Sequence, residues 1–239
     1  MTGKIKVALC LSGEPRSSMF CFPYIYESLL QENPYFEVDT YIHSWKPFRA
    51  LPLYSPKSTK LEPYIPQIIE ENIRKNLPIQ YYTNNKIHNY FKMYYAIKTN
   101  FNQVPQPYDI YIRCRLDLIF ESKLVLYPIF LDILNKKYNL ISLHSNYPTK
   151  IENGIDDQFL ICDFKSSQIL SNYYDFITSP NNFVKNLCPN LEEFHPEQLL
   201  KKYLDSKDIN ILNIPLSNYN LVRYSGVTTA DPYFNFLDQ

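Results

Sequence analysis

The segment KIKVALCLSGEPRS, residues 4–17, carries the pattern that decides the fold of this 239-residue chain. Residues 4–11 are mostly apolar or β-branched, which predicts a buried first strand. The polar residues 12–16 end this strand in a loop, and residues 17–31 predict a helix despite Pro23. A buried strand, a short polar loop and a helix form the unit that α/β folds repeat.

The rest of the sequence continues this alternation of strands and helices. The helix predicted at 86–103 has the clearest pattern, because apolar residues recur there at i, i+3, i+4 and i+7. Other helices are expected at 66–75, 165–177 and 196–204, and strands at 37–43, 108–120, 139–144, 158–163, 208–214 and 219–223. The proline-rich residues 46–66 predict a long irregular loop. We therefore expect one α/β domain over residues 1–239, with a mostly parallel central sheet flanked by helices.

Composition argues against several classes of protein. The 24 basic residues balance the 24 acidic ones, which disfavours general binding of nucleic acid. Four glycines form neither a G-x-G-x-x-G nor a P-loop motif. No stretch approaches the roughly 20 apolar residues of a membrane span, and the N-terminus has no signal-peptide core. Five widely spaced cysteines without a C-x-x-C motif indicate a reducing, cytoplasmic compartment.

The loop after the first strand is the first candidate site. Ligands of open α/β sheets bind beyond the carboxyl ends of the strands. Ser12 and Gly13 allow the backbone to approach a ligand closely, and Arg16 supplies a fork suited to phosphate. The alternative is an ordinary strand-to-helix turn in which Ser17 is the N-cap.

The strand predicted at 108–120 holds the second candidate site. With a side-chain period of two, Arg113, Arg115 and Asp117 share one face of this strand with Tyr111. Two arginines and a carboxylate on one face are costly unless they meet solvent, a partner or an anion. As a cleft wall, Asp117 would bind a divalent cation or sugar hydroxyls, and one arginine would bind a diphosphate. The alternative is an internal ion pair between an arginine and Asp117.

The third candidate site is a pair of adjacent carboxylates, Asp156 and Asp157, which follow an Asn-Gly turn and precede a strand. Such acids position a sugar or act as a general base, and the alternative is a solvated turn. Three smaller signals are the segment HSW at 43–45, which contains the only tryptophan, Lys92 beside the apolar face of its helix, and His195 before a late helix.

Five segments, in this order, resemble small GT-A-type glycosyltransferases of large DNA viruses and of bacterial surface-polysaccharide loci. They are KVALCLSGEPRS (6–17), VDTYIHSW (38–45), KMYYAIK (92–98), YDIYIRCRLD (108–117) and DDQF (156–159). The resemblance covers roughly residues 4–223. It implies a cytoplasmic hexosyl- or deoxyhexosyltransferase that uses a nucleotide sugar as donor and a glycan or another hydroxyl compound as acceptor. It also implies a nucleotide-binding half over about 1–120 and an acceptor half over about 121–239.

The resemblance assigns roles to individual residues of this chain. Ser12, Gly13 and Arg16 would hold the nucleotide together with Lys92, Arg113, Arg115 and, near the C-terminus, Arg223. Asp156 and Asp157 would act at the donor sugar and the acceptor. The sequence departs from the family at the metal motif, because Arg115-Leu116-Asp117 stands where Asp-x-Asp is expected. Asp117 and His195 would bind Mn²⁺ or Mg²⁺ with the diphosphate, or Arg115 would replace part of the charge of that cation.

Two other functions remain open at this point. Asp117, Asp156, Asp157 and His195 are also the residue types of a metal-dependent phosphodiester hydrolase. The many tyrosines suit a non-catalytic carbohydrate-binding module. A hydrolase would need no sugar nucleotide, and a binding module would bind glycans without affinity for a nucleotide.

Overall fold

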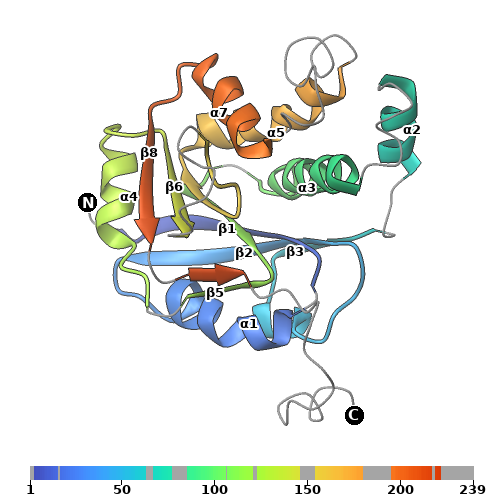
Figure 1. Cartoon of the computed structure of the whole chain (residues 1–239). Helices are drawn as coiled ribbons and strands as arrows, with labels where there is room; N and C mark the ends of the chain where they lie inside the picture. Colours follow the sequence, from blue (N-terminus) through green and yellow to red (C-terminus); the bar gives the residue numbers. More distant parts are fainter. Residues whose placement is uncertain are drawn as a thin grey trace.

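A seven-stranded sheet lies at the centre of the molecule (Figure 1). The computed structural model describes residues 3–15, 17–62, 67–76, 85–105, 107–120, 123–145, 154–179, 195–216 and 219–221. The strands, in their spatial order, are β3 (Ser58–Leu61), β2 (Phe36–Ser44), β1 (Ile5–Gly13), β4 (Ile110–Arg115), β7 (Phe159–Cys162), β6 (Leu140–Ser145) and β8 (Ile211–Leu216). All pairings are parallel except those of β7, which runs against both neighbours. The prediction of a mostly parallel sheet flanked by helices is confirmed.

Helices cover both faces of the sheet (Figure 1). The described helices are α1 (Ser18–Ile25), continued by a π-helical turn (Tyr26–Leu30), α2 (Gln67–Asn76), α3 (Asn85–Phe101), α4 (Tyr127–Leu134), α5 (Phe164–Thr178) and α7 (Pro196–Asp205). One apolar core joins the sheet to α3, α5 and α7, and a second joins it to α1 and α4. The chain thus has the three layers of an α/β fold.

The helix α3 follows the predicted apolar pattern. Its residues at i, i+3, i+4 and i+7 are all buried: Ile87, Tyr90, Phe91, Tyr94, Ile97 and Phe101. At the far end of the helix, the buried Asn100 donates a hydrogen bond from Nδ2 to the carbonyl of Leu11 in β1, at 2.7 Å. This bond fixes α3 across the end of the strand that carries Ser12.

Two sequence-based predictions are wrong in part. Residues 46–66 are not an irregular loop throughout, since they contain a 3₁₀ helix (Leu51–Tyr54) and the strand β3, which pairs with β2. β3 forms because residues 58–61 lack proline and extend the sheet at its edge. The single strand predicted at 108–120 is two strands. A turn at Leu116 and Asp117 separates β4 from β5 (Leu118–Phe120), which pairs with β9 (Tyr219–Leu221) in a separate ribbon.

The lengths of the described helices also bear on membrane insertion. Among the residues described, no helix combines the length and the apolar character needed to cross a bilayer.

Asp163 is predicted to stabilise the fold as the N-cap of α5. Its Oδ1 accepts a hydrogen bond from the backbone N–H of Ser166 at 2.7 Å, and its Oδ2 accepts one from Asn139 at 3.1 Å. Asp163→Ala should lower the free energy of unfolding by about 1 kcal/mol, measured by urea titration. Asp163→Asn keeps a capping oxygen and should lose much less. Equal losses in the two variants would contradict the capping role.

Candidate active site at the carboxyl edge of the sheet

Four chain segments meet at one edge of the sheet because of its register. Ser12 of β1 lies beside His43 of β2 on one side and beside Arg115 of β4 on the other. β7 is antiparallel, so its first residue, Phe159, pairs with Cys114 near the end of β4. Asp156 and Asp157, which precede β7, therefore lie at the same edge as the two arginines. The structure brings together described residues of all three candidate sites that the sequence suggested separately.

Arg113 is the most unusual residue of this edge. It is 2% exposed, and it donates a long hydrogen bond, 3.5 Å from Nη1 to the carbonyl of Ser12. Within the described part of the chain it forms no ion pair, and its Nε has no hydrogen-bond partner. The hydroxyl of Ser12 is likewise buried without a partner in those residues. Buried polar groups without a partner are rare in folded proteins, and each calls for a water, an ion or a ligand, or for a role in catalysis.

Arg115 and Asp117 form the internal ion pair that was the alternative to a cation site. Nε and Nη2 of Arg115 donate to Oδ1 and Oδ2 of Asp117 at 2.7 and 2.8 Å. Asp117 is 1% exposed, and the arginine side chain is 18% exposed. Although burial opposes it, this fork raises the pKa of Arg115 above its usual range. Asp117 therefore holds Arg115 in one orientation at the mouth of the site.

Asp157 is a buried carboxylate beside the arginines. Its Oδ2 accepts a hydrogen bond from the hydroxyl of Tyr94 in α3 at 2.9 Å. Burial raises the pKa of Asp157 above its ordinary value, and the charge of Arg113 and the bond from Tyr94 oppose part of that rise. Asp156 is buried too, and its Oδ1 accepts the backbone N–H of Gln158 at 2.9 Å. Neither acid lies on a solvated turn, so that alternative is wrong.

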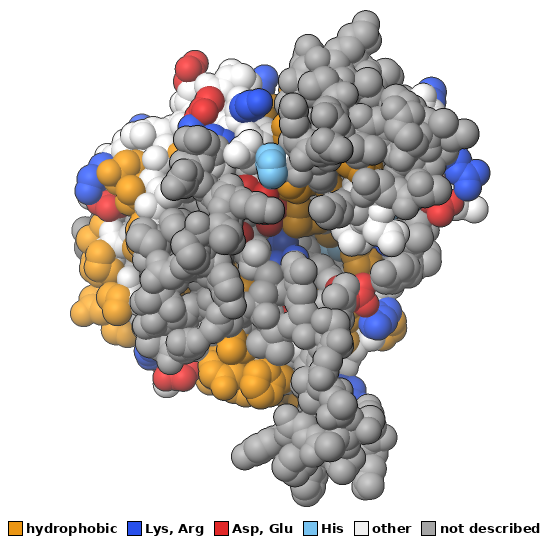
Figure 2. Space-filling model, viewed as in Figure 1, with side chains coloured by type: hydrophobic (Ala, Val, Ile, Leu, Met, Phe, Trp, Pro, Cys, Tyr) orange, Lys and Arg blue, Asp and Glu red, His pale blue; other side chains and the backbone are white. Residues whose placement is uncertain are grey.

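A cavity of about 190 Å³ opens at this edge of the sheet. It is lined by Ser12, Gly13, Glu14, Trp45, Asn89, Lys92, Met93, Ala96, Arg113 and Arg115. The wall thus combines hydroxyl and backbone groups, three cations and one aromatic ring. In Figure 2, acidic and basic side chains lie side by side in a hollow near the middle of the molecule, below a histidine.

Glu197 and Tyr94 belong to the site, although the sequence did not single them out. Burial and the charge of Asp157 raise the pKa of Glu197 above its usual range. Its helix packs closely on the acidic segment: the N–H of Ile155 donates to the carbonyl of Glu197 at 3.1 Å, and a Cβ at Gly154 would lie 2.8 Å from that of Glu197. An available signal was the position of Glu197, two residues after the candidate His195. Tyr94 could not be singled out from the sequence, because it belongs to the apolar face of α3.

The expected metal site has a poor fit to the described residues. No group of three or more His, Cys, Asp or Glu side chains in that part of the chain is arranged to hold a metal ion. Both oxygens of Asp117 are used by Arg115. His195 is the N-cap residue of α7 and makes no side-chain capping bond. Two further expected ligands of the nucleotide, Arg16 and Arg223, lie outside the described residues.

Comparisons with known proteins give structural likeness only. No protein-family model and no curated protein matches the sequence. The chain is similar to mouse xyloside xylosyltransferase 1 (TM-score 0.44, 10% identity), over 85% of this chain and 81% of that one. It is also similar to the glycosyltransferase GlyE of Streptococcus pneumoniae TIGR4 in its apo form (TM-score 0.48, 13% identity), over 88% of this chain and 45% of that one. A second GlyE structure gives a TM-score of 0.45 at 11% identity.

This chain therefore spans less than half of the length of GlyE. At these TM-scores the likeness does not define a function.

The ion pair between Arg115 and Asp117 is predicted to stabilise the folded protein. Asp117→Ala leaves the arginine without its partner in a mostly buried position, so the free energy of unfolding should fall by about 3 kcal/mol. Asp132→Ala is the control, because its pair with Lys137 is largely exposed and should be worth less than about 1 kcal/mol. Thermal unfolding of the two variants checks this. Equal melting temperatures for both would show that the buried pair is not structural.

Proposed function

We propose that the protein is a glycosyltransferase that moves a sugar from a nucleoside-diphosphate donor to a hydroxyl acceptor. The observation that carries the proposal is Arg113: a buried guanidinium without an ion-pair partner in the described residues, lining a cavity beside a buried carboxylate. Transfer of a glycosyl group needs both a positive charge and a carboxylate. It builds negative charge on the leaving diphosphate and positive charge on the sugar ring.

The order of the strands arranges the polar and aromatic groups of the site in a line along the edge of the sheet. Trp45 follows β2, Ser12 and Gly13 end β1, the arginines lie on β4, and the acids precede β7. Since β2, β1, β4 and β7 are successive neighbours, the edge presents an aromatic ring, hydroxyl and backbone groups, cations and carboxylates in that sequence. A nucleotide sugar has the same order of base, diphosphate and sugar. The sugar would then lie next to Asp157, and the acceptor beyond it.

We propose that arginines stabilise the leaving diphosphate. Arg113 and Arg115 supply fixed positive charge in a partly enclosed site, where electrostatic stabilisation is strongest. The fork of Asp117 keeps Arg115 oriented before the donor binds, so little reorganisation is needed during transfer. Lys92, on the α3 wall of the same cavity, adds a further cation. No step in this scheme depends on a metal ion held by Asp117.

Asp157 is proposed as the group that receives the proton of the acceptor hydroxyl. A raised pKa makes a carboxylate a better base, and burial provides that rise here. Tyr94 holds the side chain in place through its hydrogen bond. Glu197, whose pKa is also raised, keeps a second carboxyl group nearby. Asp156 shapes the turn that presents Asp157, because its side chain binds the backbone of Gln158.

Binding of a nucleoside diphosphate should depend on Arg113. A ligand at about 100 times its dissociation constant adds roughly 2.7 kcal/mol, which raises the melting temperature by about 5–10 °C for a chain of this size. Arg113→Met should remove most of this shift for the matching diphosphate among UDP, GDP and TDP. The free variant should be at least as stable as the wild type, because an unpaired buried charge is removed.

Lys165→Met is the matched control, since it removes an exposed cation on α5. It should keep the full shift. The shift and the transfer of sugar should also persist in EDTA. A shift that required Mn²⁺ would contradict the arginine scheme, and no shift with any diphosphate would contradict the transferase.

Asp157→Asn should lower the turnover number at least about 100-fold, the lower end for a positioned base. The control Asp205→Asn changes an exposed acid on α7 and should be silent. Activity should fall as the pH drops through the raised pKa of Asp157, where the base becomes protonated. Tyr94→Phe removes a bond that stabilises the carboxylate, so this acid limb should move to higher pH. A pH profile of kcat that is unchanged in Tyr94→Phe would argue against Asp157 as the base.

A further inference from the structure

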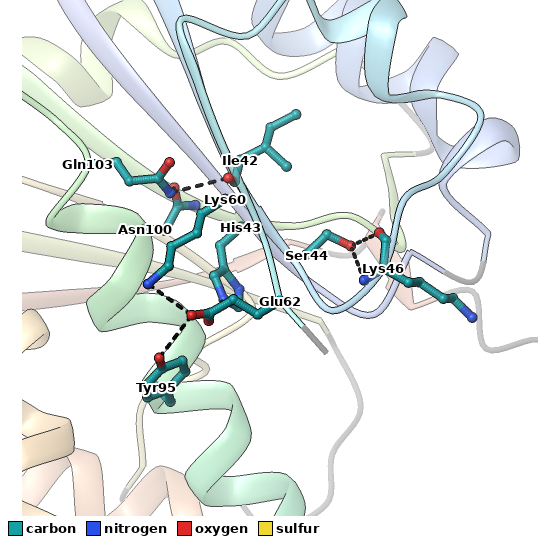
Figure 3. A network of polar contacts seen from close by, with 9 residues as sticks. All are labelled: Ile42, His43, Ser44, Lys46, Lys60, Glu62, Tyr95, Asn100 and Gln103. Carbon is teal, nitrogen blue, oxygen red and sulfur yellow. Dashed lines mark hydrogen bonds and ion pairs between the residues drawn. The ribbon is translucent and has the colours of Figure 1, made fainter. Parts of the chain in front are cut away.

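The HSW segment at the end of β2 belongs to a polar network that the proposed chemistry does not use. Figure 3 shows this network, in which side chains from β2, β3 and α3 converge on Glu62. Oε2 of Glu62 lies 2.7 Å from Nε2 of His43. Its Oε1 accepts a hydrogen bond from the hydroxyl of Tyr95 at 3.1 Å and lies 2.9 Å from Nζ of Lys60. Three elements are therefore tied together by one carboxylate.

The network pairs a neutral imidazole with an ionised carboxylate. Burial lowers the pKa of His43, which is 0% exposed, so its imidazole is neutral near pH 7. Burial raises the pKa of Glu62, but hydrogen bonds with His43 and Lys60 outweigh it, and the net pKa is lowered. Glu62 is therefore an acceptor, and Nε2 of the neutral His43 carries the proton that it accepts.

Trp45 is held against this network on two sides. Its ring stacks on that of Tyr95, with centroids 5.9 Å apart and planes 23° apart. The ring of His43 meets it edge-on at 4.9 Å and 88°. Glu62 binds both of these supporting rings through their polar atoms. Trp45 is 5% exposed and lines the same cavity as Arg113.

β3 depends on Glu62 for its position more than a longer strand would. It has four residues, three of them exposed, at the edge of the sheet. The backbone N–H of Glu62 extends the pairing by donating to the carbonyl of Ser44 at 3.0 Å. A short exposed strand buries little apolar surface, so the polar contacts of Glu62 add to the backbone pairing with β2 that attaches it.

We propose that Glu62 is a positioning residue that fixes Trp45 as the wall against which the aromatic base of the donor binds. The inference rests on the proposed function. A base, rather than the transferred sugar, faces Trp45 because the arginines of β4 lie between this ring and the carboxylates before β7. An aromatic ring in a cavity wall contacts any base, face-on or edge-on, and the Asn89 amide on the same wall suits the polar edge of a base.

Trp45 reports on this contact directly, because it is the only tryptophan in the chain. Its fluorescence is measured during titration with UDP, GDP, TDP and CMP, and with inorganic pyrophosphate as a probe without a base. A nucleotide that binds should change the emission of Trp45. Pyrophosphate should bind at the arginines, seen by thermal shift, without changing that emission.

The variant Glu62→Ala should raise the dissociation constant of the nucleotide about tenfold and leave that of pyrophosphate within about twofold, because only the base contact is lost. It should also raise KM for the donor and change kcat little. Glu62→Gln keeps an oxygen that accepts from His43 and should restore most of the binding. Glu37→Ala, which removes an exposed glutamate at the other end of β2, is the matched control. If Glu62→Ala fails to fold, Tyr95→Phe removes one bond of the network and keeps the stacked ring.

The outcomes separate this inference from the proposed function. An emission change with a nucleotide alone, together with the selective loss in the Glu62 or Tyr95 variant, supports the positioning role. Nucleotide binding that leaves Trp45 emission unchanged, or an equal loss for nucleotide and pyrophosphate, overturns the positioning role and leaves the transferase standing. Absence of binding by every probe overturns both.

Discussion

A buried positive charge governs the arrangement of this site. Arg113 extends from a central strand into the layer between the sheet and α3, where no side chain of the described residues forms an ion pair with it. Such a charge is costly to keep away from water unless a ligand or a nearby acid compensates for it. The neighbours of Arg113 are consistent with this constraint. Asp157 lies close enough to interact with its charge, and Arg113 lines a cavity in which an anion would neutralise that charge.

The reversed strand β7 explains how acids and arginines come to share one edge. In a fully parallel sheet only the carboxyl ends of strands meet there, and each strand contributes the loop that follows it. β7 contributes the segment that precedes it, so Asp156 and Asp157 enter the site from the opposite chain direction. The arginines of β4 and the acids before β7 therefore come from segments that are well separated in sequence and held in adjacent strands.

Much of this arrangement was predictable from local sequence. Period-two patterning placed Arg113 on a buried strand, and the 3.6-residue pattern identified α3, because both patterns report burial of a whole face. The orientation of β7 was not predictable, since strand direction depends on pairing across the sheet. The partner of Asp117 stayed open for a similar reason: the chain turns after Arg115, and only the folded backbone shows which side chains then meet. That Tyr94 and Glu197 share one site was not predictable for the same reason, because only the tertiary fold brings their helices to this edge.

The sheet order has a consequence for how the protein folds. β1 pairs with β2 nearby in sequence, but its other neighbour, β4, is about 100 residues further along the chain. Closing such a long loop costs entropy before the new strand contacts repay it, and topologies with distant pairings fold slowly. Cys10 lies beside Arg113 only after this step. The charged edge therefore cannot form until this long-range pairing is made, so its assembly is tied to the slowest kind of contact in the fold.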